Sequence, residues 1–315
     1  MSNEVIVLNG ASHYGISSTI SLQSSLFECG DISFKLNDSV RNKNITIIQG
    51  FGLPNTHLME LMVCIDACKR SGSDKITLIL PFLPYSRQDK RHESGMAVSV
   101  KVVLDMIKSV NVNRIISFDL HANSITAILP NDIQFDHIMM SAFWDYHLTR
   151  SYGDLREWCF VSPDAGAIKR THGLATQCKS PDVCFINKIR EKAGVVKEMT
   201  LIGDVKGKRC ILADDMADSC GTLIKAKNVL YKAGALDVKC VATHGILSTG
   251  AYTKIANGGL EITVSDSCYV PDVDKEGATL PEDVTVIPLK NFMLDILHRV
   301  DNGIMMSTLF NGWYE

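Results

Sequence analysis

The sequence lacks the features of a membrane, secreted or nucleic-acid-binding protein. No segment approaches the roughly 18 uninterrupted apolar residues of a membrane-spanning helix. The N-terminus, MSNEVIVLNG, has no basic segment of the kind that opens a signal peptide, and it is typical of a β-strand instead. The net charge of −3 gives no electrostatic reason to bind nucleic acid, which usually requires a basic face. We therefore expect a cytoplasmic protein with neither membrane nor nucleic-acid partners.

The ten cysteines do not form a recognisable metal or disulfide framework. No pair has the Cys-x-x-Cys spacing, and no Cys and His spacing matches a zinc site. Most of the cysteines lie inside apolar segments, namely Cys64, Cys68, Cys159, Cys184, Cys210 and Cys240. We interpret the cysteines as buried free thiols of a protein in a reducing compartment.

Two glycine-rich segments near the N-terminus fall short of the common nucleotide-binding motifs. The segment Gly10-Ala-Ser-His-Tyr-Gly15 has Walker-like glycine spacing, but Ile16 stands where a P-loop requires lysine. The segment Gly50-Phe-Gly52 lacks the third glycine of a dinucleotide fingerprint. Any nucleotide must therefore be bound in another way.

Short β-rich runs alternate with helical patterns along the whole chain. Apolar residues recur at helical spacing in 58–68, 100–107 and 223–230. The predicted strands are 5–9, 45–49, 76–81, 114–119, 159–162, 183–187, 210–213, 238–243, 262–264 and 284–288. These strands are continuous apolar runs, as expected when helices cover both faces of a sheet. The repeated β-α-β order predicts an α/β fold with parallel sheets.

Ten strands with their helices are more than one hydrophobic core usually holds. We therefore expect two domains, residues 1–145 and 146–300. No low-complexity linker separates them, and a helix is predicted within Ser141–Glu157, where they meet. The C-terminal tail, FNGWYE, is expected to join the first domain. Ligands of parallel sheets bind beyond the carboxyl ends of the strands, so functional residues are sought after each apolar run.

Acidic residues follow two of the predicted strands. Strand alternation would place Asp119 and His121 on one side, where they could bind a divalent cation or hydrogen-bond to each other. The run Ser162-Pro-Asp164 leads into a helix with Lys169 and Arg170 in its first turns. A helix N-terminus favours anions, although the two cations could also be solvated.

Basic residues follow two other strands. Lys188 and Arg190 would share one face if their strand continues, where they could meet a phosphate chain or form a solvated basic edge. The loop 81–95, PFLPYSRQDKRHESG, is densely charged and directly follows a buried strand. Loops in that position often carry function.

The segment Arg209–Leu223, RCILADDMADSCGTL, combines carboxylates with a turn rich in small polar residues. Backbone N–H groups of such a turn, closed by a helix N-terminus, bind phosphate without a lysine. The adjacent Asp214 and Asp215 would repel a bare anion, but they suit a ligand that also offers hydroxyl groups or brings Mg²⁺. A sugar phosphate meets both conditions.

Several motifs resemble one enzyme family, in the same order along the chain. ILADDMADSCGT resembles the phosphoribosyl diphosphate loop of phosphoribosyltransferase-type folds, in the form found in ribose-phosphate diphosphokinases (phosphoribosyl pyrophosphate synthetases). PYSRQDKR resembles the family's ATP-binding flexible loop, and FDLHA resembles its metal and ATP segment. VSPDAGAIKR resembles its second acidic signature, and NKIREKA the segment with its catalytic Lys and Arg.

The resemblance implies two phosphoribosyltransferase-like domains, with the ATP-binding loop in 1–145 and the ribose 5-phosphate site in 146–300. It implies transfer of the diphosphoryl group of MgATP to the 1-hydroxyl of ribose 5-phosphate, which gives 5-phosphoribosyl 1-diphosphate and AMP. Mg²⁺ is the implied metal, and the implied assembly is a homo-oligomer, from a dimer up to a hexamer.

The resemblance also assigns residues to four roles. The catalytic pair would be Lys188 and Arg190. ATP would be bound by Phe27, Arg87, Gln88 and His121. Ribose 5-phosphate would be bound by Asp214, Asp215, Asp218, Ser219, Cys220, Gly221 and Thr222. The metal would be held by His121, Asp164 and Asp119.

Two alternatives remain open. One is a catalytically silent regulatory homologue that modulates an active partner. The other is a phosphoribosyltransferase that consumes the product. The motifs around Lys188, Asp164 and His121 are present without insertion, which favours the enzyme over the regulatory homologue. A phosphoribosyltransferase should lack a second nucleotide-binding half.

Overall fold

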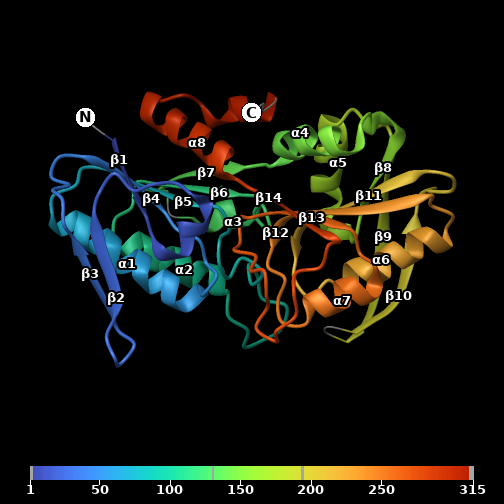
Figure 1. Ribbon diagram of the computed structural model, residues 1–315, viewed down its shortest axis with the longest axis horizontal. Coiled ribbons are helices and arrows are strands. Elements are labelled where there is room, and N and C mark those ends of the chain that lie inside the picture. Colours follow the sequence, from blue (N-terminus) through green and yellow to red (C-terminus); the bar gives the residue numbers. More distant parts are fainter. Residues whose placement is uncertain (1–2, 130, 193–194, 312–315) are drawn as a thin grey trace. The chain divides into compact units, whose positions relative to one another are not determined.

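The computed structural model describes residues 3–129, 131–192 and 195–311, without the side chains of 189–192, 195–198, 310 and 311. Its contacts divide the chain into two compact units, shown in Figure 1. Unit 1 comprises Met1–Met139, Ser267–Tyr269 and Leu289–Met306. Unit 2 comprises Met140–Asp266, Val270–Pro288 and Ser307–Glu315. The main division falls between Met139 and Met140, and the C-terminal part of the chain is shared between the units. The tail FNGWYE lies mostly outside the described residues, and its place in the first domain stays a prediction.

Unit 1 is built on a parallel sheet in the order β1-β4-β5-β6-β7. Its strands are β1 (Asn3–Val7), β4 (Asn44–Ile48), β5 (Ile76–Leu80), β6 (Arg114–Phe118) and β7 (Gln134–Ile138). Strands β2 (Leu22–Leu26) and β3 (Ile32–Leu36) form an antiparallel hairpin. Its strand β3 packs against helix α1 (Pro54–Arg70). The helices are η1 (Asn9–Tyr14), α1 (Pro54–Arg70), α2 (Ser99–Ser109), α3 (Ile125–Ile128) and α8 (Lys290–Asn302).

Helix α1 shows how the sequence determines these elements. Pro54 occupies its first turn, where the missing backbone N–H costs nothing. The face formed by Leu58, Leu61, Ile65 and Cys68 is buried against the sheet, as the helical spacing predicts. Helix α8 packs on the sheet as well, because the ring of its Phe292 lies edge-on to that of Phe118 in β6, at 5.6 Å.

Unit 2 contains a sheet in the order β10-β9-β8-β11-β12-β13-β14, parallel except for the edge strand β10. The strands are β8 (Trp158–Ser162), β9 (Val183–Lys192), β10 (Val195–Ile202), β11 (Arg209–Ala217), β12 (Asp237–Gly245), β13 (Ile262–Ser265) and β14 (Val284–Ile287). The helical segments are α4 (Ser141–Tyr152), η2 (Leu155–Glu157), η3 (Ala165–Ala167), α5 (Ile168–Gln177), α6 (Gly221–Lys232), α7 (Ala251–Gly258) and η4 (Met306–Asn311).

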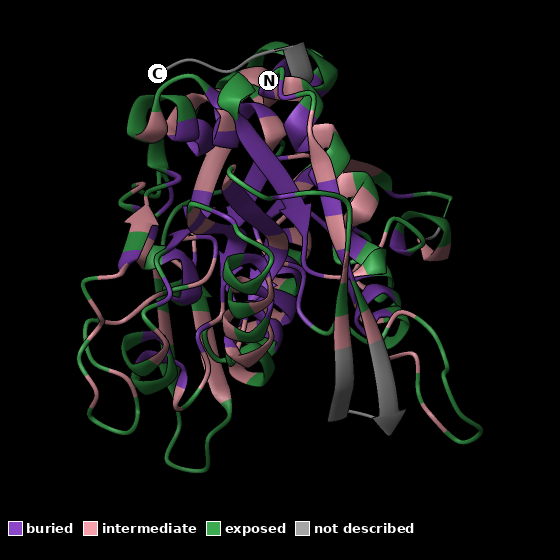
Figure 2. Ribbon diagram, turned by 90° about the vertical axis from the view of Figure 1, so that its right-hand side faces the viewer, coloured by how far each residue is buried: buried purple, intermediate pink, exposed green. Residues whose placement is uncertain are grey.

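Helices cover both faces of this sheet: Figure 1 shows α4 and α5 on one side and α6 and α7 on the other. Figure 2 shows the consequence, with the strands largely buried and the outer helix surfaces exposed. The predicted α/β class is therefore confirmed. The strand order reverses at β8, because β9 pairs with one of its edges and β11 with the other. Such a reversal creates a crevice at the carboxyl ends of the strands, where ligands bind.

Most predicted elements are present with shifted ends, and four strands were missed. The missed strands are β2, β3, β7 and β10. Strands β9 and β11 are longer than predicted, so Asp214 and Asp215 lie within β11 rather than after it. The helix predicted in Ser141–Glu157 is α4, followed by the short η2.

The two glycine segments of unit 1 meet each other at the ends of β1 and β4. A Cβ atom on Gly10 would lie 2.1 Å from the carbonyl oxygen of Gly50, and one on Gly50 would lie 2.2 Å from the carbonyl oxygen of Gly10. Beside them, Gln49 donates to the buried carboxylate of Glu60 at 3.0 Å. These glycines are therefore explained by close backbone packing.

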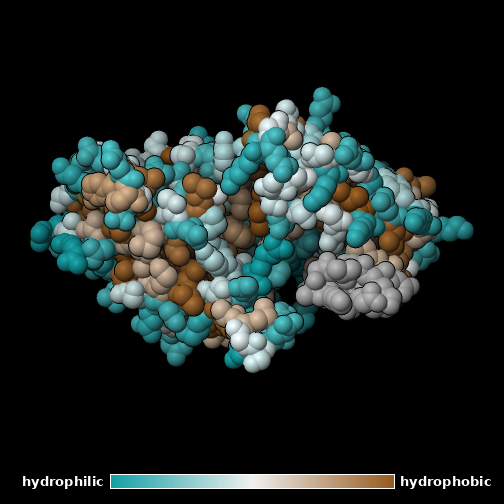
Figure 3. All heavy atoms as spheres, turned by 90° about the horizontal axis from the view of Figure 1, so that it is seen from below, coloured by the Kyte–Doolittle hydropathy of each residue, from teal (hydrophilic) through white to brown (hydrophobic). Residues whose placement is uncertain are grey.

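The outer surface mixes residue types. Figure 3 shows hydrophobic groups dispersed among hydrophilic ones on one face. Within the described residues, no helix combines the length and the apolar character that crossing a bilayer requires.

Candidate functional site

The candidate site of unit 2 lies at the carboxyl ends of β8, β9 and β11, where the strand order reverses. After β8, the chain turns through Asp164, whose backbone is extended and whose carboxylate caps η3. Its Oδ1 accepts hydrogen bonds from the backbone N–H groups of Gly166 at 3.0 Å and Ala167 at 3.1 Å. The Ser162 hydroxyl donates to the Asp164 carbonyl at 2.6 Å. This network fixes the acidic turn before any ligand binds.

The ammonium of Lys188 reaches the same carboxylate from β9. Its Nζ lies 3.2 Å from Asp164 Oδ2, and its side chain is only 7% exposed. Strand β9 continues to Lys192, so the condition for Lys188 and Arg190 to share a face is met by the backbone. The side chain of Arg190 lies outside the described residues, and its role stays a prediction.

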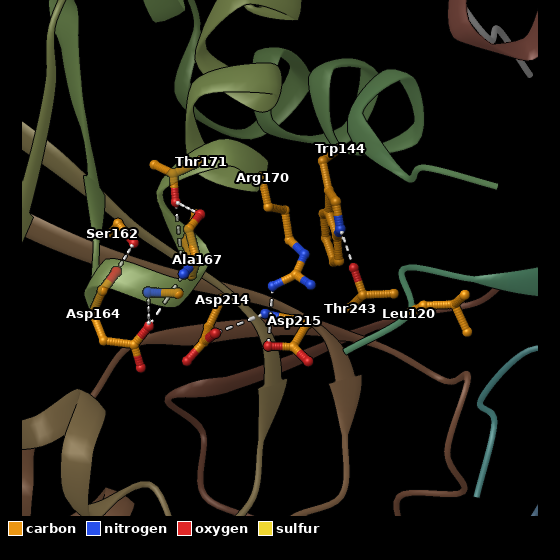
Figure 4. A network of polar contacts seen from close by, with 12 residues as sticks. Leu120, Trp144, Ser162, Asp164, Ala167, Arg170, Thr171, Asp214, Asp215 and Thr243 are labelled. Carbon is orange, nitrogen blue, oxygen red and sulfur yellow. Dashed lines mark hydrogen bonds and ion pairs between the residues drawn. The ribbon is translucent and has the colours of Figure 1, made fainter. Parts of the chain in front are cut away.

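The two adjacent aspartates of β11 have different surroundings, as Figure 4 shows. Asp215 is buried, and its Oδ1 lies 3.1 Å from Nη1 of Arg170 in α5. Asp214 is half-buried, and its Oδ1 accepts a hydrogen bond from the Asp215 backbone N–H at 2.9 Å. Desolvation by the surrounding protein, followed by the negative charge of Asp215, raises the pKa of Asp214 well above its ordinary value.

Replacing Asp214 by asparagine is expected to raise the melting temperature of the ligand-free protein at pH 7.5. Because the folded-state pKa is raised, the ionised carboxylate destabilises the fold once the pH exceeds the ordinary value of 3.8. The gain of Asp214→Asn should therefore grow from pH 4 upward and level off above the folded-state pKa. Thermal melts over pH 4–8 test this, with the exposed Asp272→Asn as the control. A melting temperature below that of the wild type at pH 7.5 would contradict it.

The turn after β11 runs through Asp218 and Ser219 into the N-terminus of α6, which begins at Gly221. Cys220 precedes this helix in the left-handed conformation, with φ of 57°. Backbone N–H groups of a turn that enters a helix make a concave anion-binding surface. Burial raises the pKa of the Cys220 thiol to about 12, so the thiol is protonated and not a nucleophile at neutral pH.

The left-handed backbone at Cys220 makes a prediction about substitution there. Cys220→Val is expected to be about 1–2 kcal/mol less stable than Cys220→Gly, because a β-branched side chain opposes this conformation and glycine does not. Chemical denaturation measures the difference. Cys240 is an equally buried cysteine inside β12, so Cys240→Val and Cys240→Gly should not show the same preference for glycine.

The residues predicted to bind ATP belong to unit 1. Phe27 is exposed in the β2–β3 turn, and its backbone N–H donates to the Asp31 carbonyl at 2.8 Å. Arg87 and Gln88 are exposed in the loop after β5. Gln88 is tied down there: its N–H donates to the Tyr85 carbonyl at 3.1 Å, and its side-chain oxygen accepts from the Ser99 hydroxyl.

Asp119 and His121 do not follow the alternation on which their pairing was predicted. Strand β6 ends at Phe118, and Asp119 adopts a positive φ of 30°. Asp119 is buried and donates its N–H to the Ile138 carbonyl at 3.0 Å, whereas His121 is exposed. Strand alternation therefore does not apply to these two residues, and their role at a metal site stays a prediction.

Protein ligands alone do not make a metal cage in the part of the chain that the structure describes. No group of three or more His, Cys, Asp or Glu side chains there is arranged to hold an ion. The donor types at Asp119, His121 and Asp164 nevertheless suit Mg²⁺, which is usually held by one or two carboxylates together with substrate phosphates and water.

Arg170 is the residue whose position the sequence left open. It was interpreted together with Lys169 as an anion-binding or solvated cation at the start of α5. The structure separates them, since Lys169 is exposed and Arg170 is ion-paired with a buried aspartate. Helical spacing could have predicted this difference, because neighbouring residues of a helix lie on different faces.

Sheets of mainly parallel strands flanked by helices, with a turn that enters a helix N-terminus beside a strand-order reversal, define an α/β protein. Residues 9–110 match the model of the N-terminal domain of ribose phosphate pyrophosphokinase, and residues 176–311 match the phosphoribosyl synthetase-associated domain. The chain belongs to the ribose-phosphate pyrophosphokinase family, and the resemblance seen in the motifs is confirmed.

Two relatives show how far the similarity extends. A ribose-phosphate pyrophosphokinase from Maricaulis maris (strain MCS10) is 33% identical over 287 residues, which are 90% of each chain. The crystal structure of phosphoribosylpyrophosphate synthetase from Mycobacterium smegmatis is 29% identical and superposes with a TM-score of 0.85, covering 96% of this chain and 100% of that one. Both matches span the two units.

Proposed function

We propose that this chain transfers the diphosphoryl group of MgATP to the 1-hydroxyl of ribose 5-phosphate, giving 5-phosphoribosyl 1-diphosphate and AMP. The observation that carries the proposal is the phosphate-binding turn Asp218–Thr222 beside an acidic pair, at the strand-order reversal of a family member. Phosphate needs backbone donors, and sugar hydroxyls need carboxylate acceptors. Both kinds of group lie in one short segment, Asp214–Thr222.

The acceptor substrate is assigned to unit 2. Residues of the turn bind the 5-phosphate, namely Asp218, Ser219, Cys220, Gly221 and Thr222. Asp214 and Asp215 bind the ribose hydroxyls. Lys188 and Arg190 neutralise the negative charge that grows on the transferred group, which is the main requirement of phosphoryl-type transfer.

The nucleotide is assigned to unit 1, where Phe27, Arg87, Gln88 and His121 contact ATP. Asp119 and His121 provide Mg²⁺ ligands in unit 1, and Asp164 provides one in unit 2. The bound Mg²⁺ supplies positive charge that neutralises the phosphate oxygens. No thiol takes part, which agrees with the raised pKa of Cys220.

The test is an assay of the purified protein with MgATP and ribose 5-phosphate, in which AMP and 5-phosphoribosyl 1-diphosphate are followed by ³¹P NMR. Both products should appear in equal amounts. Neither should form when EDTA is present from the start or when ribose 5-phosphate is omitted. A regulatory homologue would form neither product. A phosphoribosyltransferase would instead release diphosphate from added 5-phosphoribosyl 1-diphosphate and a nucleobase.

We also propose that the chain is cytoplasmic and forms a homo-oligomer, at least a dimer and up to a hexamer. The described cysteines are free thiols, which suits a reducing compartment. Light scattering of the purified protein measures the mass of the assembly, and a monomer would contradict the proposal.

A further inference from the structure

The side chain of Arg170 is directed from the first turn of α5 to the end of β11, as Figure 4 shows. Its Nη1 lies 3.1 Å from Oδ1 of Asp215. The Arg170 side chain is 20% exposed and that of Asp215 only 5%. An ion pair so shielded from water is screened little, and removing one partner leaves a buried charge uncompensated.

The next residue of α5 contacts the same strand. Thr171 is buried, and its hydroxyl lies within hydrogen-bond distance of two carbonyl oxygens, that of Ala167 at 3.1 Å and that of Ala213 in β11 at 3.4 Å. Consecutive residues of α5 therefore contact Asp215 through its side chain and Ala213 through its backbone. These two contacts flank Asp214 on both sides in the sequence.

Asp214 is in turn oriented by its neighbour. The Asp215 backbone N–H donates to Asp214 Oδ1 at 2.9 Å, so the position of the Asp215 peptide determines where the Asp214 carboxylate lies. The interactions connect Arg170 to the Asp215 side chain and the Asp215 backbone to the Asp214 carboxylate. Asp214 is half-buried, and it is therefore the more accessible member of the pair.

Two cations at this edge of the sheet each form an ion pair with a different carboxylate. Lys188 pairs with Asp164, and Arg170 pairs with Asp215. Without Arg170, the two adjacent carboxylates would repel each other with no positive charge between them to offset the repulsion. The guanidinium is suited to this role because it is charged at every accessible pH and its donors form a rigid fork.

We propose that Arg170 is a positioning residue that holds the Asp214–Asp215 pair in the arrangement that binds the vicinal hydroxyls of a sugar phosphate. The inference rests on the proposed function, since ribose 5-phosphate is the ligand considered. It separates two contributions to affinity: the turn 218–222 binds the phosphate, and the pair positioned by Arg170 binds the sugar. Loss of Arg170 should therefore weaken the sugar contribution selectively.

Isothermal titration calorimetry with ribose 5-phosphate and with inorganic phosphate separates the two contributions. Arg170→Met is expected to weaken ribose 5-phosphate binding at least about tenfold, the usual effect of one lost charge-assisted contact, and to change phosphate binding less than about twofold. Arg170→Lys should restore part of the loss because it keeps the charge. Lys169→Met, at the exposed neighbouring position, is the matched control and should behave as the wild type.

Asp215→Asn provides a second route to the same ion pair without a change of volume. It should show the same selective loss, and Arg170→Met combined with Asp215→Asn should lose less than the sum of the two single variants. If Arg170→Met does not fold, Arg170→Lys and Asp215→Asn carry the test.

Three results would overturn the inference. The first is unchanged ribose 5-phosphate binding in both Arg170→Met and Asp215→Asn. The second is an equal loss of both ligands, which would show a merely structural role. The third is a wild type that binds ribose 5-phosphate no more tightly than phosphate. A wild type that binds ribose 5-phosphate selectively but forms no AMP would refute the proposed reaction and leave the role of Arg170 standing.

Discussion

Replacing Lys188 by methionine is expected to lower kcat by about 10²–10³, the usual effect of removing one group that stabilises charge in the transition state. The Lys188 side chain is almost fully buried, and its ammonium lies against Asp164 at the reversal of the strand order. A buried cation in that position acts more strongly than one in water, since the surroundings screen it little. If it acts on charge that develops during transfer, KM for ribose 5-phosphate should change less than about threefold.

Steady-state kinetics and ribose 5-phosphate titration of Lys188→Met separate these effects. Lys208→Met is a matched control, because Lys208 also pairs with an aspartate, Asp182, but immediately before β11, at the opposite end of that strand from the site. Its kcat should stay within about twofold of the wild type, as expected for a partly exposed pair. A collapse of affinity in Lys188→Met with little change in kcat would make Lys188 a ground-state binding residue.

Gly10→Ala is expected to destabilise the protein by about 3 kcal/mol, at the upper end of overpacking effects. The new Cβ would lie 2.1 Å from the Gly50 carbonyl oxygen, which is main-chain and cannot rotate away. It would also lie 2.7 Å from Gln49 Oε1, and so disturb the residue that donates to the buried Glu60 carboxylate. The melting temperature should fall by about 6–12 °C for a unit of this size.

Gly52→Ala is the control for that substitution. A Cβ there meets atoms only at 3.9 Å or beyond, which is ordinary contact. Its stability should therefore remain within about 0.5 kcal/mol of the wild type. Calorimetry or thermal melts compare the two variants, and equal melting temperatures would show that the two loops can move apart.

Most of the predicted strands differ in one property from three of the missed strands. Segments such as ITLIL in β5 are continuous apolar runs buried on both faces, and such runs are visible in a sequence. The missed strands LQSSL, ISFKL and QFDHI mix polar and apolar residues and are only partly buried. Their pairing partners, which determine that they are strands, cannot be read from local pattern.

The candidate site was predictable where a single segment carries the chemistry. The carboxylates and the small polar turn of Asp214–Thr222 lie in one segment, and so the pattern indicated a sugar phosphate. The partner of Asp215 is Arg170, on a different element, and only the packing of α5 on β11 brings them together. The turn at Asp119 was missed because a positive φ is uncommon at non-glycine residues, and the enrichment of Asp there is too weak to predict it at one position.

The burial of the cysteines leaves one thiol that a reagent can reach easily. Cys29, in the β2–β3 turn two residues after Phe27, is exposed, whereas Cys268 is half-buried and the other eight are buried. Burial also raises the pKa of the Cys178 and Cys240 thiols above the ordinary value, which reduces the reactive thiolate. A maleimide fluorophore would therefore attach at a single place without prior mutagenesis. A fluorophore on Cys29 would therefore report changes in the surroundings of the β2–β3 hairpin.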